Sequence, residues 1–203
     1  MKNQFFLLLA IVALIVSCNK ENEPVKPDYF QLKAGNYWIY QTYELAGDSV
    51  EDVIPFTDST YIEKDTVING NVYYKFMSQS FTGGMHTPSF ARDSAGCLIN
   101  ESGKISFSYT NFTDTLSTYT EGNIFRATYM MEKHDSLVNV PAGSFNALFC
   151  HVRIVMYNPS YPYGTRHQGT FFADGVGCVK STSASLGSSD RYLDTRLIRY
   201  HVR

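Results

Sequence analysis

The chain has 203 residues, of which 44% are hydrophobic and 18% charged, with a formal net charge of −2. It is therefore long enough to bury one substantial core. A chain so close to neutral carries no basic stripe of the kind that nucleic-acid binding needs, so nucleic acid is excluded as a partner. Its four cysteines form no Cys-x-x-Cys or Cys/His cluster, and we expect neither a metal nor a cofactor.

The N-terminus starts with Met-Lys-Asn-Gln and then runs from Phe5 to Val16 without a charge. A basic start, an apolar run of about a dozen residues and a small residue at its end are typical of a secretory signal peptide. The run is too short for a bilayer span, which needs about 20 apolar residues. We therefore expect residues 1–17 to be a signal peptide that is removed from the mature protein.

The end of this segment, Ile15-Val16-Ser17-Cys18, resembles the lipobox of bacterial lipoproteins. The resemblance implies that the Cys18 thiol receives a diacylglycerol, that cleavage occurs just before Cys18, and that the new amino group is acylated. Several acyl chains hold a protein on a membrane far more firmly than one. The alternative is an ordinary signal peptide that contains a cysteine. The resemblance predicts an outer-membrane protein whose partner is the membrane, bound through the N-terminal lipid.

Residues 18–28 contain charges, two prolines and one aliphatic residue, and we expect them to form a flexible tether. Within them, Lys20-Glu21-Asn22-Glu23 resembles the acidic signal that sends some lipoproteins to the outer face of the cell, although Asn22 interrupts the acidic pair. The domain is therefore either surface-exposed or periplasm-facing. Residues 29–203 remain for a single β domain.

The clearest strands lie between Asp58 and Phe81, where two β-rich runs are separated by Asn69-Gly70. This arrangement is a strong hairpin signal. No stretch after the signal peptide keeps a helical apolar pattern for three turns. We predict an all-β antiparallel meander that forms an open barrel, half-barrel or sandwich, with no substantial helix. Its further strands are expected at Tyr37–Leu45, Phe90–Arg92, Cys97–Ile99, Ile105–Tyr109, Phe125–Met131, Ala147–Tyr157, Gly169–Phe172, Cys178–Ser181 and Arg191–His201.

Three segments carry a family resemblance: FQLKAGNYWIYQTYEL, VNVPAGSFNALFCHVRI and FFADGVGCVK. In this order, they resemble the G-x-x-W-x-Y, V-x-x-P-A-G-x-F and A-D-G-V-G-x-V pattern of uncharacterised lipoproteins of Gram-negative bacteria. The resemblance extends from about Phe30 to Val179. It implies an all-β envelope domain without a settled biochemical role. Cys178 stands where an aliphatic residue is more usual, which suggests a place in the core.

Once Cys18 is lipidated, Cys97, Cys150 and Cys178 remain. In an oxidising envelope at most one pair of them can form a disulfide, which leaves one free thiol. The sequence does not say which two would pair.

Seven of the eleven aspartates are followed directly by Ser or Thr. Most of these pairs resemble the D-S/T-aliphatic acceptor motif for O-glycosylation of exported proteins in some Gram-negative anaerobes. The alternative is that such pairs begin turns, because both side chains bond to nearby backbone amides. The two interpretations are compatible, and Ser49 and Ser94 are favoured because we expect them in loops. The candidate acceptors are Ser49, Ser59, Thr66, Ser94, Thr115 and Ser136.

The sequence gives no pattern typical of an enzyme. Its five histidines share no ligand spacing, and no G-x-S-x-G segment is present. His151 follows Cys150 directly, but neighbours in a strand point to opposite faces and would not form a nucleophile–base pair. We therefore expect a protein without catalysis.

A binding module is the interpretation we favour. Residues 156–169 form a Pro/Gly loop in which Tyr157, Tyr161, Tyr163 and Arg166 are candidate ligand-binding residues. Exposed tyrosines would indicate a carbohydrate, whereas a concave apolar cavity would indicate a lipid. The alternative for the tyrosines is that they cover the underside of their own loop. The alternative function is a structural or scaffold envelope protein that binds a partner protein through a sheet edge or a flat apolar patch.

Overall fold

The computed structural model describes residues 26–46, 50–79, 87–160, 164–185, 187–188 and 190–203, and within these ranges every regular element is a strand. All neighbouring strands pair in antiparallel fashion in a single twelve-stranded sheet. The expected all-β class is therefore confirmed. The strands are β1 (Tyr37–Ala46), β2 (Val50–Ile68), β3 (Asn71–Gln79), β4 (Thr87–Ser94), β5 (Cys97–Asn100), β6 (Ile105–Ser108), β7 (Ser117–Glu121), β8 (Phe125–Val140), β9 (Gly143–Met156), β10 (Thr165–Ala173), β11 (Gly177–Ala184) and β12 (Arg191–His201).

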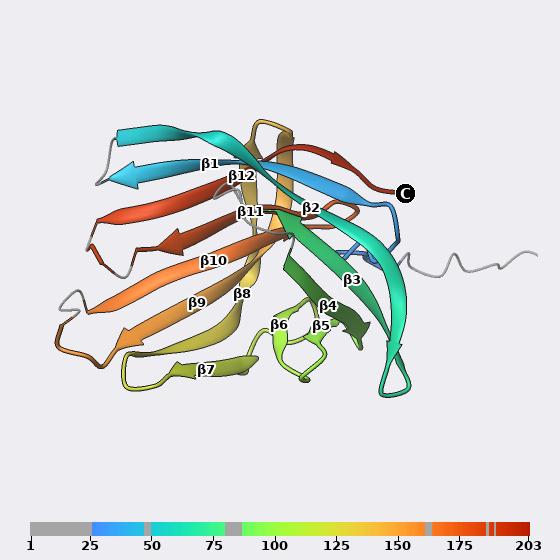
Figure 1. The fold of residues 1–203 in the computed structure, drawn as a ribbon, viewed down its shortest axis with the longest axis horizontal. Helices are drawn as coiled ribbons and strands as arrows, with labels where there is room; N and C mark the ends of the chain where they lie inside the picture. The colour runs from blue at the N-terminus through green and yellow to red at the C-terminus, as the bar shows by residue number, and fades with distance from the viewer. Residues whose placement is uncertain (1–25, 47–49, 80–86, 161–163, 186, 189) are drawn as a thin grey trace, which may run out of the picture.

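The sheet curls into a nearly closed barrel (Figure 1). Its order is β6-β5-β4-β3-β2-β1-β12-β11-β10-β9-β8-β7, so β6 and β7 are the two edges. Ser117 Oγ on β7 donates a hydrogen bond to the Ile105 carbonyl on β6 at 2.7 Å, which brings the edges together. Behind this seam, Cys150 Sγ on β9 donates to the Ser106 carbonyl at 3.2 Å. Of the three expected architectures the molecule adopts the barrel rather than the sandwich.

The hairpin expected at Asn69-Gly70 joins β2 to β3. Ile68 pairs with Asn71, so the turn has two residues. Asn69 and Gly70 have φ of 51° and 77°. Positive φ at both central positions is the type I′ geometry, whose twist matches that of the flanking strands.

Several strands begin earlier than expected, and two differ in a way that has a clear physical reason. β8 was expected to end at Met131, but it continues to Val140 through a register shift between Met131 and Asp135. A bulge of this kind accommodates the charged run at 132–135 without ending the strand. β7 was not predicted, because four of its five residues are exposed and it pairs only with β8, so its sequence shows no buried alternation.

The core has two main parts inside the barrel. One surrounds Trp38, Ile62 and Leu197, and the other surrounds Phe107 and Leu148. The turn between β8 and β9 packs on the first part, where the Ala142 amide donates to the Leu197 carbonyl at 3.0 Å. This explains the P-A-G-x-F segment, which ends one strand and returns the chain to the core.

Residues 26–36, which we name the N-terminal strap, close one end of the barrel. Phe30 is 5% exposed and lies against the rings of Phe107, Tyr109 and Phe172. The strap begins inside the segment expected as a tether, and its first residue, Lys26, already contacts Asp93 of the barrel. The rest of that tether and the signal peptide lie outside the described residues.

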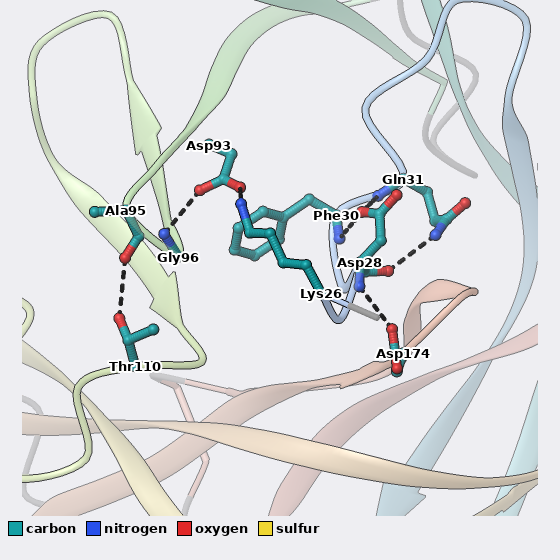
Figure 2. Close-up of polar contacts among 9 residues, drawn as sticks. All are labelled: Lys26, Asp28, Phe30, Gln31, Asp93, Ala95, Gly96, Thr110 and Asp174. Carbon is teal, nitrogen blue, oxygen red and sulfur yellow. Dashed lines mark hydrogen bonds and ion pairs between the residues drawn. The ribbon is translucent and has the colours of Figure 1, made fainter. Parts of the chain in front are cut away.

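Asp28 connects the strap to the turn between β10 and β11 (Figure 2). Its amide donates to Asp174 Oδ1 at 2.7 Å, and its carbonyl accepts from the Gly175 amide at 3.0 Å. Asp28 Oδ1 also accepts from the Gln31 amide at 2.9 Å, which turns the strap into the barrel. The A-D-G-V-G segment is therefore a docking point for the N-terminal chain.

The same turn receives Trp38 from β1. The indole Nε1 donates to the Val176 carbonyl at 2.6 Å, and the indole ring lies over Gly177. Two residues along β1, the Tyr40 hydroxyl donates to the Cys178 carbonyl at 3.0 Å. The W-x-Y and A-D-G-V-G segments, far apart in sequence, thus form one structural unit.

We predict that Gly177→Ala destabilises the fold more than Gly175→Ala. Both glycines have positive φ, 98° and 71°, so both changes strain the backbone. A Cβ at Gly175 meets nothing within 4 Å, whereas one at Gly177 lies 3.1 Å from Trp38 Nε1. Overpacking of this kind adds about 1–3 kcal/mol. Denaturant unfolding followed by Trp38 fluorescence measures the difference, and equal losses would contradict the close packing of the indole.

Candidate functional site

The first hollow of the molecule, about 470 Å³, lies beside the strap. Phe30 and Leu32 contribute apolar surface, and Lys26 and Asp93 contribute charge. The two charged side chains face each other at 3.1 Å (Figure 2). Lys26 and Asp93 of this hollow therefore serve the docking of the strap, while the Arg92 guanidinium lies over the Tyr73 ring, 5.5 Å from its centre.

A row of hydroxyl side chains crosses four adjacent strands on the concave face. Thr170 on β10 lies directly opposite Ser181 on β11, Ser181 opposite Thr195 on β12, and Thr195 opposite Thr42 on β1. We name these four residues the hydroxyl row. With neighbouring strands about 4.8 Å apart, the row spans roughly 14 Å.

The second hollow, about 420 Å³, is lined by three members of this row, Thr170, Ser181 and Thr195, whereas Thr42 is buried beside it. A further hydroxyl pair, Thr60 and Ser78, contributes at 3.1 Å on β2 and β3. The one carboxylate in the described lining is Asp58, whose Oδ2 accepts from Thr42 Oγ1 at 2.9 Å. The described lining consists of Tyr40, Asp58, Ser59, Thr60, Ser78, Gln79, Thr170, Cys178, Ser181 and Thr195.

Two of the hydroxyls are available to a ligand. Thr42 and Thr195 bond to each other at 3.0 Å, but no hydrogen bond between described residues involves the side chains of Thr170 or Ser181. A hydroxyl both donates and accepts, so this pair of hydroxyls suits a ligand that carries hydroxyls itself. The described lining contains no Lys, Arg or His, and this does not favour an anionic ligand.

The hydroxyl row was missed in the sequence. Ser181 and Thr195 lie in strands that we expected, but nothing in the sequence of these strands indicates that their hydroxyls meet. Only the register of four strands shows that these side chains meet, and register across a barrel depends on long-range pairing.

On the outer face, two histidines contact each other. His151 Nε2 and His167 Nδ1 lie 2.8 Å apart on β9 and β10, and Glu132 Oε1 lies 3.9 Å from His151 Nδ1. Burial, followed by the nearby His167, lowers the pKa of His151 below its ordinary value of 6.5. Cys150 points into the core, as expected for the neighbour of His151 in a strand. The described residues hold no group of three or more potential metal ligands.

The three cysteines of the domain are free thiols. Burial raises the pKa of the Cys150 thiol to about 12 and that of Cys178 to about 11, so neither forms a thiolate readily. Cys178 packs against the core around Trp38. This agrees with the expectation that its position, where an aliphatic residue is more usual, belongs to the core.

The candidate ligand-binding residues are only partly described, since Tyr161 and Tyr163 lie outside the described ranges. Tyr157 is 46% exposed, whereas Arg166 is buried. The Arg166 guanidinium lies 4.7 Å from the centre of the Tyr192 ring and donates to the Arg191 carbonyl at 3.3 Å. The structure therefore assigns Arg166 contacts inside the barrel and leaves Tyr157 at the surface.

The candidate glycosylation sites remain predictions. Thr115 is exposed before β7, whereas Ser59, Thr66, Ser94 and Ser136 lie in strands and are half-buried, and Ser49 lies outside the described residues. Ser94 was expected in a loop but ends β4, where it pairs with Cys97. Asp93 begins the turn by accepting from the Gly96 amide at 2.9 Å (Figure 2). At this position the turn interpretation applies.

Among solved structures, two share this fold. One is a candidate lipoprotein from Parabacteroides distasonis ATCC 8503, 11% identical, with a TM-score of 0.55 over 88% of this chain and 100% of that one. The other is a candidate exported protein with a YmcC-like fold from Bacteroides fragilis NCTC 9343, 12% identical, with a TM-score of 0.52 over 87% of this chain and 100% of that one. No protein-family model and no curated protein matches the chain.

At these identities the likeness shows the fold alone. The chain is thus an all-β protein whose barrel resembles those of a candidate lipoprotein and a candidate exported protein. In the part of the chain that the structure describes, no helix is long and apolar enough to cross a membrane.

We predict that His151 makes stability depend on pH. Because its folded pKa is lowered, the unfolded chain binds more protons near the ordinary value of 6.5. The contribution of the neutral imidazole is therefore present above pH 6.5 and is lost as the pH falls towards the folded pKa. Relative to His151→Gln, the wild type should lose unfolding free energy between about pH 7.5 and 5.5. His201→Gln, at an exposed histidine of β12, is the control, and parallel curves for wild type and His151→Gln would contradict the prediction.

Proposed function

We propose that this protein is a lipid-anchored component of the cell envelope that binds a small, neutral, polyhydroxylated ligand, such as a carbohydrate, in the cavity over the hydroxyl row. The observation that carries the proposal is the alignment of Thr42, Thr195, Ser181 and Thr170 across four strands. A cavity of about 420 Å³ lies within the range of small-molecule sites. The Tyr40 ring and the threonine methyl groups offer apolar surface to the C–H faces of a sugar.

The distribution of apolar side chains favours a polar ligand over an acyl chain. The apolar end of the barrel is filled by its own side chains, with Phe107, Ile62 and Leu197 at no more than 1% exposure. Six of the ten residues in the described lining of the remaining space carry a serine or threonine hydroxyl. An acyl chain would leave those hydroxyls without partners, which costs binding energy.

The same lining supports binding rather than catalysis. It offers one carboxylate, Asp58, and no histidine that could act as a base beside a hydroxyl nucleophile. Hydrolysis of a glycoside requires two carboxyl groups that flank the scissile bond. The described lining supplies only one of them.

The proposed location depends on the lipobox-like segment that ends at Cys18 and on the structural likeness to a candidate lipoprotein and a candidate exported protein. Acylation at Cys18 would hold the domain at the outer membrane by a short tether that leads into the strap. A mature protein whose mass lacks acyl chains, measured after expression in a bacterial envelope, would overturn this part of the proposal.

We predict that Thr170→Val with Ser181→Ala abolishes most of the affinity for sugars without unfolding the protein. Two lost hydrogen bonds of about 1 kcal/mol each correspond to a decrease in affinity of at least tenfold. Because these hydroxyls serve no bond between described residues, the free energy of unfolding should change by no more than about 0.5 kcal/mol. Calorimetric titration with glucose, galactose, N-acetylglucosamine and their disaccharides measures the affinity.

Thr118→Val, at an exposed threonine of β7, is the matched control and should bind as the wild type does. Binding that survives the double change would overturn the assignment to the hydroxyl row. Native mass spectrometry of the same preparation separates the remaining alternatives. A releasable fatty-acid adduct would overturn the proposal in favour of a lipid carrier, and a stable complex with another protein would overturn it in favour of a scaffold.

A further inference from the structure

The β2–β3 hairpin extends past the rim of the barrel. β1 begins to pair with β2 at Tyr61, and β4 pairs with β3 only as far as Tyr74. Beyond these points, Lys64–Ile68 of β2 pair with β3 alone, and Asn71–Tyr73 of β3 pair with β2 alone. The hairpin therefore projects about 20 Å past the start of β1 and about 10 Å past the last residue of β3 that pairs with β4. Figure 1 shows this hairpin reaching beyond the neighbouring strands.

The tip of this hairpin is uncharged and partly apolar. Residues 66–74 read TVINGNVYY and contain no ionisable group other than the tyrosine hydroxyls. Val67 and Val72 lie directly opposite each other and are 68% and 51% exposed. The first charges behind the tip are Asp65 and Lys75, and Lys75 pairs with Glu63 at 2.8 Å. An apolar tip followed by a charged collar is the pattern of a segment that enters the interface of a bilayer.

The tether leaves the domain beside this hairpin. Lys26 and Pro27 line the same hollow as Val72 and Tyr74. Seven residues, 19–25, separate Lys26 from Cys18, so an anchor at Cys18 lies at most about 28 Å away. The projecting hairpin and the anchor can therefore reach one bilayer plane together.

We propose that the tip of the β2–β3 hairpin, residues 66–72, dips into the membrane surface to which the tether holds the protein. The inference rests on the anchoring at Cys18 in the proposed function. Once the chain is tethered, contact of the tip with lipid is an intramolecular event, so a small apolar patch is sufficient to be occupied. The contact would orient the barrel relative to the membrane.

A second uncharged hairpin, between β8 and β9, is not expected to enter the membrane. The β8–β9 turn also lacks charge, but its Ala142 amide is bonded to the Leu197 carbonyl and its Phe145 ring contacts the ring of Tyr200 at 6.2 Å. Leu137 on β8 is nevertheless 69% exposed. It is therefore a matched apolar position at the same end of the barrel, on a hairpin that is held against the core and does not project.

The test places a second tryptophan at each position. Trp38, the one native tryptophan, is 3% exposed and serves as an internal reference. Full chains carrying Val67→Trp or Leu137→Trp are produced in a bacterial envelope and reconstituted in nanodiscs of phosphatidylethanolamine and phosphatidylglycerol, with or without brominated acyl chains. Bromine should reduce the added emission of Val67→Trp about twofold, because a segment of this kind lies 5–10 Å deep. The emission of Leu137→Trp and of Trp38 should not change.

The experiment distinguishes a hairpin tip that does not enter the membrane from a chain that is not acylated at Cys18. The mass of the reconstituted protein reports acylation at Cys18, and a mass without acyl chains overturns the anchor. The quenching is also measured on the same variants with a hexahistidine tag before Asn19 in place of the lipid anchor. Vesicles that contain nickel-chelating lipid then hold the domain at the same tether length. Quenching of Val67→Trp alone supports the proposal. No quenching of a bound chain, or equal quenching of both variants, overturns it.

Discussion

The hydrogen bond from the Trp38 indole to the Val176 carbonyl is the contact on which the rest of the architecture depends. It joins the first strand to the turn between β10 and β11, which is also the point where the strap docks through Asp28. A barrel made of local hairpins has few constraints between its first and last strands other than ladder bonds. Trp38 supplies one across the interior, and it requires a residue without a side chain at Gly177.

This contact divides the interior of the barrel into two unlike parts. Near the turn, the strap inserts Phe30 between aromatic rings, and the space is filled. Further along the same strands, Tyr40 marks the boundary, with its hydroxyl bonded to the Cys178 carbonyl. Next to Tyr40, the concave side chains of β1, β12, β11 and β10 are the threonines and serine of the hydroxyl row, which are smaller than the aromatic residues of the filled end. The hollow over the hydroxyl row therefore exists because small side chains replace bulky ones at this level of the barrel.

Local patterns were sufficient to predict most of the fold. The Asn69-Gly70 turn has a backbone geometry that its sequence dictates, and sequence patterns located eleven of the twelve strands in whole or part. The patterns missed β7, because that strand has no buried face. They also ended β8 too early, because the strand continues through charged residues that begin at Glu132. They also could not locate the candidate site. Whether Thr170 faces Ser181 depends on register between strands, and register is decided by packing of the whole barrel.

The strap and the hydroxyl row lie towards opposite ends of the barrel. The strap, the β10–β11 turn and the β2–β3 hairpin occupy the same end, because Gly35 and Asn36 pair with Ile62 where β1 begins. Along β1 the chain runs from this end through Tyr40 to Thr42, so the hydroxyl row lies away from it. If the tether and the hairpin tip both face the membrane, the filled end of the barrel faces the lipid and the polar cavity lies on the side away from it. A ligand that is soluble in water would then reach the cavity without crossing the membrane surface.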